Sequence, residues 1–155
     1  MRIAKPSKKV IDSFPKEISD FYLSHAKKSY EVINSSKIQK FIEEILRIED
    51  IDEKKIIDVR IMIFPCVVDS DSTSGIFNHD IGQISIYPSF FHDNKKSIPK
   101  CLMNFDNPDL EVIITIKTFQ TFVHEILHLK YKNEDDIEVL TDKYTAKLCK
   151  TMCYF

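Results

Sequence analysis

The segment TFVHEILHLKY, residues 121–131, contains the pattern H-E-x-x-H as His124, Glu125 and His128. Residues four apart on a helix lie one turn apart on the same face, so both imidazoles could bind one metal ion. Zinc accepts nitrogen ligands in a near-tetrahedral arrangement, and a catalytic site keeps one position for water. Glu125 is offset around the helix, where its carboxylate could take a proton from that water. We therefore predict one zinc ion (Zn2+) per chain, with His124 and His128 as ligands and Glu125 as general base.

The residues around the motif favour a metal site over a chance pair of surface histidines. The neighbours are apolar, which indicates a buried helix: Phe122, Val123, Ile126, Leu127 and Leu129. Two imidazoles and a carboxylate are costly to bury without partners, and a bound metal removes that cost. The alternative is an incidental pair of histidines at positions i and i+4 on the surface.

A third protein ligand has two candidates in the sequence that follows, Glu134 and Glu138. Glu134 lies six residues after His128, where zinc proteases with the extended motif H-E-x-x-H-x-x-G-x-x-H/D have their third ligand. Those proteases turn the chain with a glycine at the position that Tyr131 occupies here. Glu134 or a neighbouring aspartate therefore stays the alternative to Glu138.

Glu138 is favoured if two antiparallel helices are joined by a short turn at residues 132–133. In such a hairpin Glu138 lies level with His128, and Asp142 lies level with His124. Glu138 would then complete the zinc site. Asp142 would accept the ring N–H of a zinc-binding histidine and so orient that ligand. We predict Glu138 as the third ligand.

The stretch HEILH followed by EVLTD resembles the gluzincin branch of the zincin metallopeptidases, which carry H-E-x-x-H and then E-x-x-x-D on the next helix. The resemblance covers roughly residues 55–150 and implies a minimal, single-domain zinc peptidase. It departs from typical gluzincins in the shorter spacing from His128 to Glu138 and in the missing C-terminal subdomain. The roles that it implies are zinc ligation by His124, His128 and Glu138, base catalysis by Glu125, and support of a ligand by Asp142.

Zincins also place an edge strand above the motif helix, where it holds an extended substrate. The stretch GIFNHDIGQISIYP, residues 75–88, fits this part of the resemblance. Residues 82–87 alternate between apolar and polar types and end at Pro88, as an edge strand would. The resemblance therefore implies that Ile84, Ser85 and Ile86 bind a peptide by strand addition.

The elements that must position these residues follow from periodicity and capping signals. We predict helices over residues 13–34 and 36–48, the second opened by a capping box at Ser36 and Gln39. A buried strand over 55–64, a polar loop over 69–75 and an irregular stretch over 89–107 follow. Helices over 107–131 and 135–150 complete the chain. This order predicts an α+β, zincin-like single domain of residues 1–155, in which the sheet is small and mostly antiparallel and residues 1–12 form a flexible basic arm.

Composition excludes several other classes of protein. The formal charge of −2 gives no basic field for nucleic acid, and no apolar run reaches the length of a membrane span. The N-terminus has no apolar region typical of a secretory signal. The four cysteines form no C-x-x-C pair, so we predict reduced thiols in a cytoplasmic protein. The expected partner is a peptide or protein substrate.

Two other functions compete with a peptidase. The first is a non-catalytic binding or regulatory protein, in which zinc only holds the last two helices together. In the other, the chain hydrolyses RNA, as small zinc endonucleases with two histidines at i, i+4 do, but these lack the glutamate of this motif. We expect His25, His79 and His92 to lie outside the site. No spacing selects an oxyanion-stabilising residue among Tyr131, Tyr144, Tyr154, His79 and Arg60.

Overall fold

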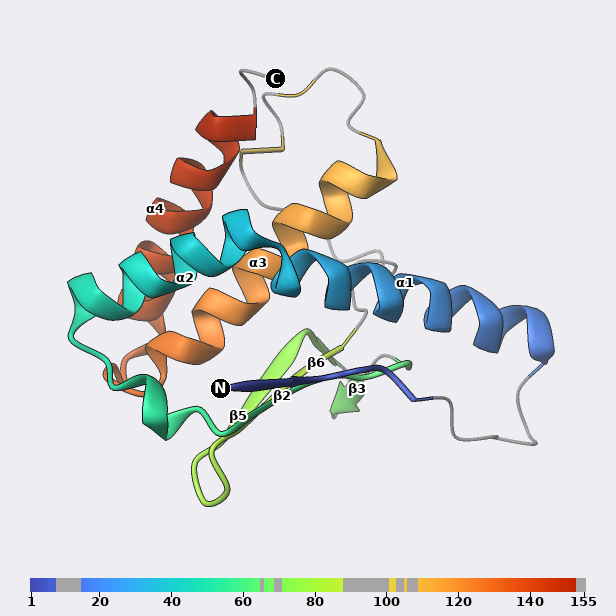
Figure 1. The fold of residues 1–155 in the computed structure, drawn as a ribbon, viewed down its shortest axis with the longest axis horizontal. Helices are drawn as coiled ribbons and strands as arrows, with labels where there is room; N and C mark the ends of the chain where they lie inside the picture. Colours follow the sequence, from blue (N-terminus) through green and yellow to red (C-terminus); the bar gives the residue numbers. More distant parts are fainter. Residues whose placement is uncertain are drawn as a thin grey trace.

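The computed structural model describes residues 1–7, 15–64, 66–68, 71–87, 101–102, 105 and 109–152. Its helices lie on one side of a small sheet, so the predicted α+β class is confirmed (Figure 1). The strands are β1 (Arg2–Ala4), β2 (Asp58–Ile61), β3 (Cys66–Val68), β4 (Asp71–Thr73), β5 (Gly75–Asn78) and β6 (Gln83–Ile86). The helices are α1 (Lys16–Asn34), α2 (Ser36–Glu49), the short 3-10 helix η1 (Glu53–Lys55), α3 (Leu110–Leu127) and α4 (Glu134–Met152).

Local capping explains where the helices begin. Ser35, rather than the predicted Ser36, caps α2, and its hydroxyl accepts a hydrogen bond from the backbone N–H of Ile38 at 3.4 Å. The Gln39 amide does not complete a capping box, because it donates to the carbonyl of Ile33 at 2.6 Å. Asp109 caps α3 by accepting from the N–H of Val112 at 2.9 Å, so the helix begins at Leu110, three residues after the predicted start.

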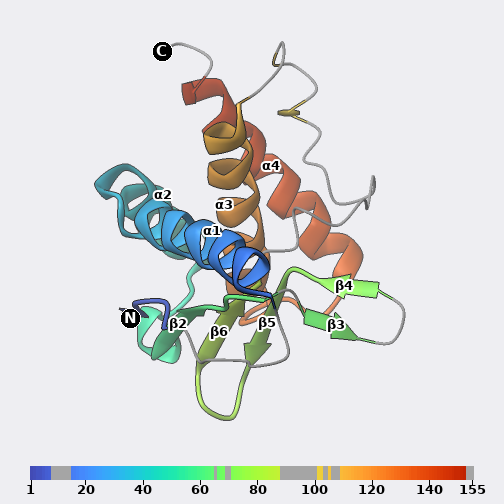
Figure 2. The ribbon, with the colours of Figure 1, turned by 90° about the vertical axis from the view of Figure 1, so that its right-hand side faces the viewer.

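The four-stranded sheet has the order β1-β2-β6-β5 and is mixed rather than mostly antiparallel. The β1–β2 and β2–β6 pairs are parallel, and only β5 and β6 pair antiparallel. The prediction of a flexible arm is wrong for Arg2–Ala4, which forms β1 and whose Arg2 guanidinium contacts Asp58 at 3.2 Å. Part of the expected 69–75 loop forms β4, which pairs with β3 as a separate hairpin visible in Figure 2.

The predicted edge strand is not at an edge. β6 lies between β2 and β5, so its backbone is paired on both sides. Ile84, Ser85 and Ile86 are all buried, and the prediction that they bind substrate by strand addition is therefore wrong. The alternating pattern of residues 82–87 did not distinguish an edge from an interior position, because the parallel pairing with β2 comes from distant sequence. The strand at this edge of the sheet is β5.

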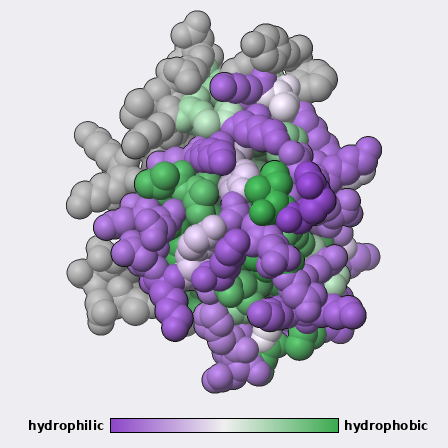
Figure 3. Space-filling view, turned by 90° about the vertical axis from the view of Figure 1, so that its left-hand side faces the viewer, coloured by the Kyte–Doolittle hydropathy of each residue, from purple (hydrophilic) through white to green (hydrophobic). Residues whose placement is uncertain are grey.

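Helix α3 is the centre of the core. Most of its residues are buried, and Phe119, Phe122 and Ile126 are fully buried. α1, α4, β5 and β6 all contact it, which agrees with its central position in Figures 1 and 2. By contrast, the face at the left of Figure 1, where α2 and α4 lie, is mainly hydrophilic, with separate hydrophobic patches (Figure 3).

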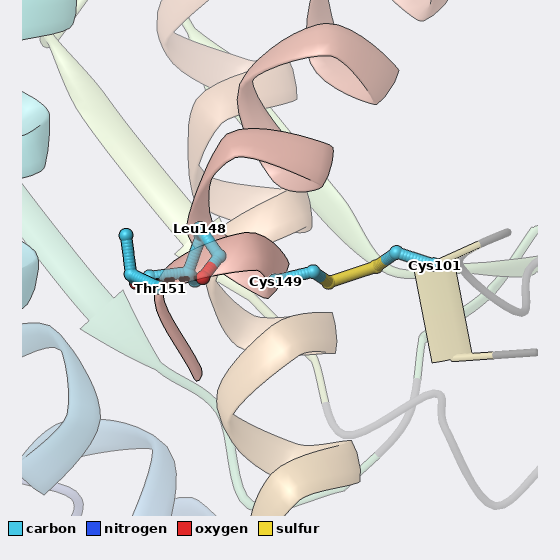
Figure 4. The surroundings of a disulfide bond; sticks show 4 residues. All are labelled: Cys101, Leu148, Cys149 and Thr151. Carbon is cyan, nitrogen blue, oxygen red and sulfur yellow. Dashed lines mark hydrogen bonds between the residues drawn. A yellow bond between two sulfur atoms is a disulfide. The ribbon is translucent and has the colours of Figure 1, made fainter. Parts of the chain in front are cut away.

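A disulfide joins Cys101 to Cys149 of α4, with the two Cα atoms 6.3 Å apart (Figure 4). The prediction of four reduced thiols is wrong for this pair, which is 48 residues apart in the chain and carries no local pattern. The side chain of Cys66 and all of Cys153 lie outside the description. Within the described part of the chain, no helix combines the length and apolarity needed to cross a membrane.

Candidate metal centre

The last turn of α3 brings His124, Glu125 and His128 together as the motif predicted. One ligand atom from each side chain lies within 4.8 Å of the others. The two imidazole rings are 5.0 Å apart between centroids and are inclined at 73°. His128 is the C-cap of α3 and keeps right-handed helical backbone, so the one-turn spacing is preserved up to the second histidine. Both rings are partly exposed, as ligands beside an open cavity would be.

The carboxylate of Glu134 faces both imidazoles. Its Oε2 lies 3.3 Å from Nε2 of His124, and its Oε1 lies 3.4 Å from Nε2 of His128. Glu134 is the first residue of α4, and its side chain is exposed. The structure therefore brings the alternative third ligand, Glu134, to the two histidines.

The connection between α3 and α4 explains why Glu134 occupies this place. The predicted helix boundaries are wrong: α3 ends at Leu127 and α4 begins at Glu134, so the connection is residues 128–133 rather than 132–133. The N–H groups of Lys130 and Tyr131 donate to the carbonyl of Leu127, which closes a tight turn directly after the helix. The side-chain oxygen of Asn133 then accepts from the N–H groups of Asp135 and Asp136 and caps α4.

Glu138 and Asp142 lie one and two turns further along α4, and both are exposed. Burial and then the charge of His128 lower the pKa of His124, while the charges of Glu134 and Glu138 act in the opposite direction. Glu138 is thus within electrostatic reach of His124. Ligation by Glu138 and support of a ligand by Asp142 stay predictions.

Glu125 is buried beneath β5, with 5 % of the residue exposed. Burial and then the charge of Glu134 raise the pKa of Glu125 to about 7, although a hydrogen bond from the backbone N–H of Phe77 acts against them. A carboxylate with a pKa near neutrality suits a general base or acid. The carboxylate of Glu125, which we expect to transfer a proton, is therefore hydrogen-bonded to β5, the strand that covers it.

Gly75 makes this close approach of strand and helix possible. A Cβ atom at Gly75 would lie 2.7 Å from Cγ2 of Thr121 and 2.9 Å from both Cγ and Oε1 of Glu125. Contacts this short are not tolerated, so any larger residue would displace Glu125 or the strand. Sequence reasoning missed Gly75, although it is one of only two glycines in the chain and begins the stretch GIFN.

A cavity of about 340 Å³ lies between β5 and the ends of α3 and α4. The motif residues, Glu134, the residues Gly75–Phe77 and His79 form its walls. His79 is in the turn after β5, as expected of a loop histidine, but it lines the cavity and its ring packs edge-on against Phe77 at 4.4 Å. It is therefore closer to the site than the sequence predicted.

The other residues considered at the sequence level lie elsewhere. His25 hydrogen-bonds to the carbonyl of Phe21 at 2.7 Å within α1, as expected of a structural histidine. Arg60 pairs with Asp58. The hydroxyls of Tyr131 and Tyr144 both donate to Glu49. His92 and Tyr154 lie outside the described residues.

Comparison of the chain with protein-family profiles, with curated proteins and with solved structures found no match.

Proposed function

We propose that this protein is a zinc-dependent metallopeptidase of the zincin type. The observation that carries the proposal is the carboxylate of Glu134 within 3.4 Å of the Nε2 atoms of His124 and His128, beside the buried Glu125. Two imidazole nitrogens and one carboxylate oxygen are a donor set that catalytic zinc sites use. This is also the set of ligand types that the gluzincin resemblance implies, with Glu134 in place of Glu138.

The four side chains divide the work between binding and proton transfer. His124, His128 and Glu134 would hold the metal. When bound, zinc would supply a Lewis acid that polarises a peptide carbonyl and lowers the pKa of a water molecule. Glu125 would accept a proton from the attacking water and return it to the leaving amine nitrogen. The hydrogen bond from the N–H of Phe77 holds that carboxylate at the cavity wall.

We assign substrate binding to β5 rather than to residues 84–86. β5 is the edge strand of the four-stranded sheet, and its residues Gly75–Phe77 line the same cavity as the motif. An extended peptide that pairs with the edge of β5 left unpaired among the described residues would lie beside the cavity that Glu125 lines. Such strand addition uses backbone hydrogen bonds for affinity and alternate side chains for specificity.

The proposal is tested with the conservative variant Glu125→Gln. A peptidase should bind about one zinc per chain both as wild type and as Glu125→Gln, while the variant loses turnover of a peptide library by at least about 100-fold. Zinc is measured by elemental analysis after expression with zinc, and cleavage by mass spectrometry. Wild-type protein that stays metal-free would refute the proposal. Zinc-loaded wild-type protein that cleaves no peptide would favour the non-catalytic binding protein.

A further inference from the structure

Glu49, the last residue of α2, is a buried carboxylate that lies outside the metal centre, and 6 % of it is exposed. Its Oε2 accepts a hydrogen bond from the hydroxyl of Tyr131 at 2.6 Å. Its Oε1 accepts one from the hydroxyl of Tyr144. The ammonium group of Lys130 donates to the backbone carbonyl of the same residue. Three side chains that are 81 to 95 residues away in the sequence therefore converge on Glu49.

These partners occupy a particular part of the chain. Lys130 and Tyr131 belong to the 128–133 connection, which begins at His128 and leads into Glu134. Tyr144 belongs to α4, the helix that Glu134 begins, and is itself buried. Glu49 thus holds both the connection and the helix that together determine where the Glu134 carboxylate lies.

Tyr131 has a second significance, because the extended zinc-protease motif has a glycine at this position. Tyr131 does not adopt the positive φ that a glycine allows, since Asp50 alone among the described non-glycine residues has one. The hydroxyl of Tyr131 donates a hydrogen bond to the buried carboxylate of Glu49, and its backbone N–H donates to the carbonyl of Leu127 at 2.9 Å. Both ends of the residue are therefore fixed by hydrogen bonds.

We propose that Glu49 is a positioning residue of the metal site. Through Tyr131 and Lys130 it holds the 128–133 connection so that Glu134 faces His124 and His128. This inference rests on the proposed metal binding, but it does not require that the protein cleaves peptides. Residues that orient ligands from outside the coordination sphere typically change metal affinity by about 10–100-fold.

A second contact between α2 and α4 provides a matched control. Glu44 of α2 pairs with Lys147 of α4 at 2.7 Å on the surface. This pair joins the same two helices as the Glu49–Tyr144 contact, but it does not touch the 128–133 connection. If Glu49 acted only by packing α2 against α4, the loss of zinc affinity in each variant would follow that variant's loss of folding stability, whichever glutamate is removed.

The experiment measures zinc affinity by competition with a chromophoric chelator, and thermal unfolding of the metal-free protein. Glu49→Gln and Tyr131→Phe should each weaken zinc binding by about 10–100-fold. Glu44→Gln should leave the affinity unchanged. In a Glu134→Ala background, Glu49→Gln should have no further effect on zinc affinity, because the ligand that it positions is absent. Should Glu49→Gln fail to fold, Tyr131→Phe removes one hydroxyl and tests the same tether.

The outcomes separate this inference from the proposed function. Zinc-free wild-type protein would overturn both. Normal zinc binding by Glu49→Gln and Tyr131→Phe, with only a lower unfolding temperature, would overturn the positioning role and leave the metal site standing. Equal losses in Glu134→Ala and wild-type backgrounds would also overturn it, since the effect would then not pass through Glu134.

Discussion

The variant Gly75→Ala tests whether the backbone of β5 packs directly against Glu125. The added methyl group would lie 2.7 Å from Cγ2 of Thr121 and 2.9 Å from Cγ and Oε1 of Glu125. Carbon atoms in contact prefer about 3.5–4.0 Å, so the strand and the helix must separate or Glu125 must move by roughly 1 Å. Either change alters the position of the carboxylate relative to the cavity.

The size of the effect follows from these contacts. Inserting a methyl group into a well-packed place costs about 1–3 kcal/mol of folding free energy. In a domain of this size each kcal/mol lowers the unfolding temperature by about 2–4 °C, so the expected loss is roughly 2–12 °C. A misplacement of about 1 Å in a catalytic group can cost about 100-fold in rate, so turnover should fall by one to two orders of magnitude. Zinc content should change less than turnover, because the three atoms nearest to the added methyl group belong to Thr121 and Glu125 and not to the imidazoles.

Gly82→Ala is the matched control. Gly82 has φ of +60°, and a Cβ there would lie 2.7 Å from the carbonyl oxygen of Lys55, away from the motif. Its backbone strain and this close contact should cost about 1–3 kcal/mol, a stability loss similar to that of Gly75→Ala. Turnover at a temperature where both variants are folded should therefore fall only in Gly75→Ala. A Gly75→Ala protein with wild-type stability and turnover would mean that β5 does not lie against Glu125, and the reasoning would be refuted.

Two further predictions concern the ligand and acid stability. Glu134→Ala should weaken zinc binding by more than the ~10–100-fold typical of residues that support a ligand. Glu138→Ala should have a smaller effect. If zinc titration shows the reverse order, Glu138 and not Glu134 is the third ligand. Burial alone would raise the pKa of Glu49, but hydrogen bonds from Tyr131 and Tyr144 and the charges of Lys130 and Lys143 hold it below its ordinary value of 4.5. The ionised Glu49 therefore stabilises the fold fully above pH 4.5, and this stabilisation is lost as the pH falls through the lowered pKa. In Glu49→Gln, the free energy of unfolding measured by denaturant titration should therefore decrease less steeply with falling pH than in the wild type. An unchanged dependence on pH would contradict this.

The parts of the site that were predictable from the sequence are those fixed by local geometry. His124 and His128 meet because four residues make about one helical turn. The position of Glu134 beside the two imidazoles was harder to predict, since it depends on where α3 ends and α4 begins. The connection also contacts Glu49, which is 82 residues before Tyr131 in the sequence and which no local pattern links to it.

The order of strands in the sheet was also not predictable, because it depends on contacts between distant parts of the chain. The stretch around Ile84 to Ile86 does form a strand, but it pairs in parallel with β2, which is distant in the sequence and which no local pattern identifies as its neighbour. The sequence therefore predicted the interior strand β6 as an edge strand, and it did not predict β5 at all. Gly75 could have been noticed, because a rare glycine at the start of a strand often marks a close approach of backbone to another group.

The pairing of β1 with β2 has a consequence for how the chain folds. Arg2 and Asp58 are 56 residues apart, whereas the β5–β6 hairpin pairs Asn78 with Gln83. Closing the longer loop costs roughly 2 kcal/mol more in chain entropy than closing the hairpin. α1 and α2 lie between β1 and β2 and can form from local contacts, so they are expected to form first and bring the two strands together. We expect the first strand to be synthesised to be among the last to gain protection in pulsed hydrogen exchange, and protection of β1 before α1 and α2 would contradict this order.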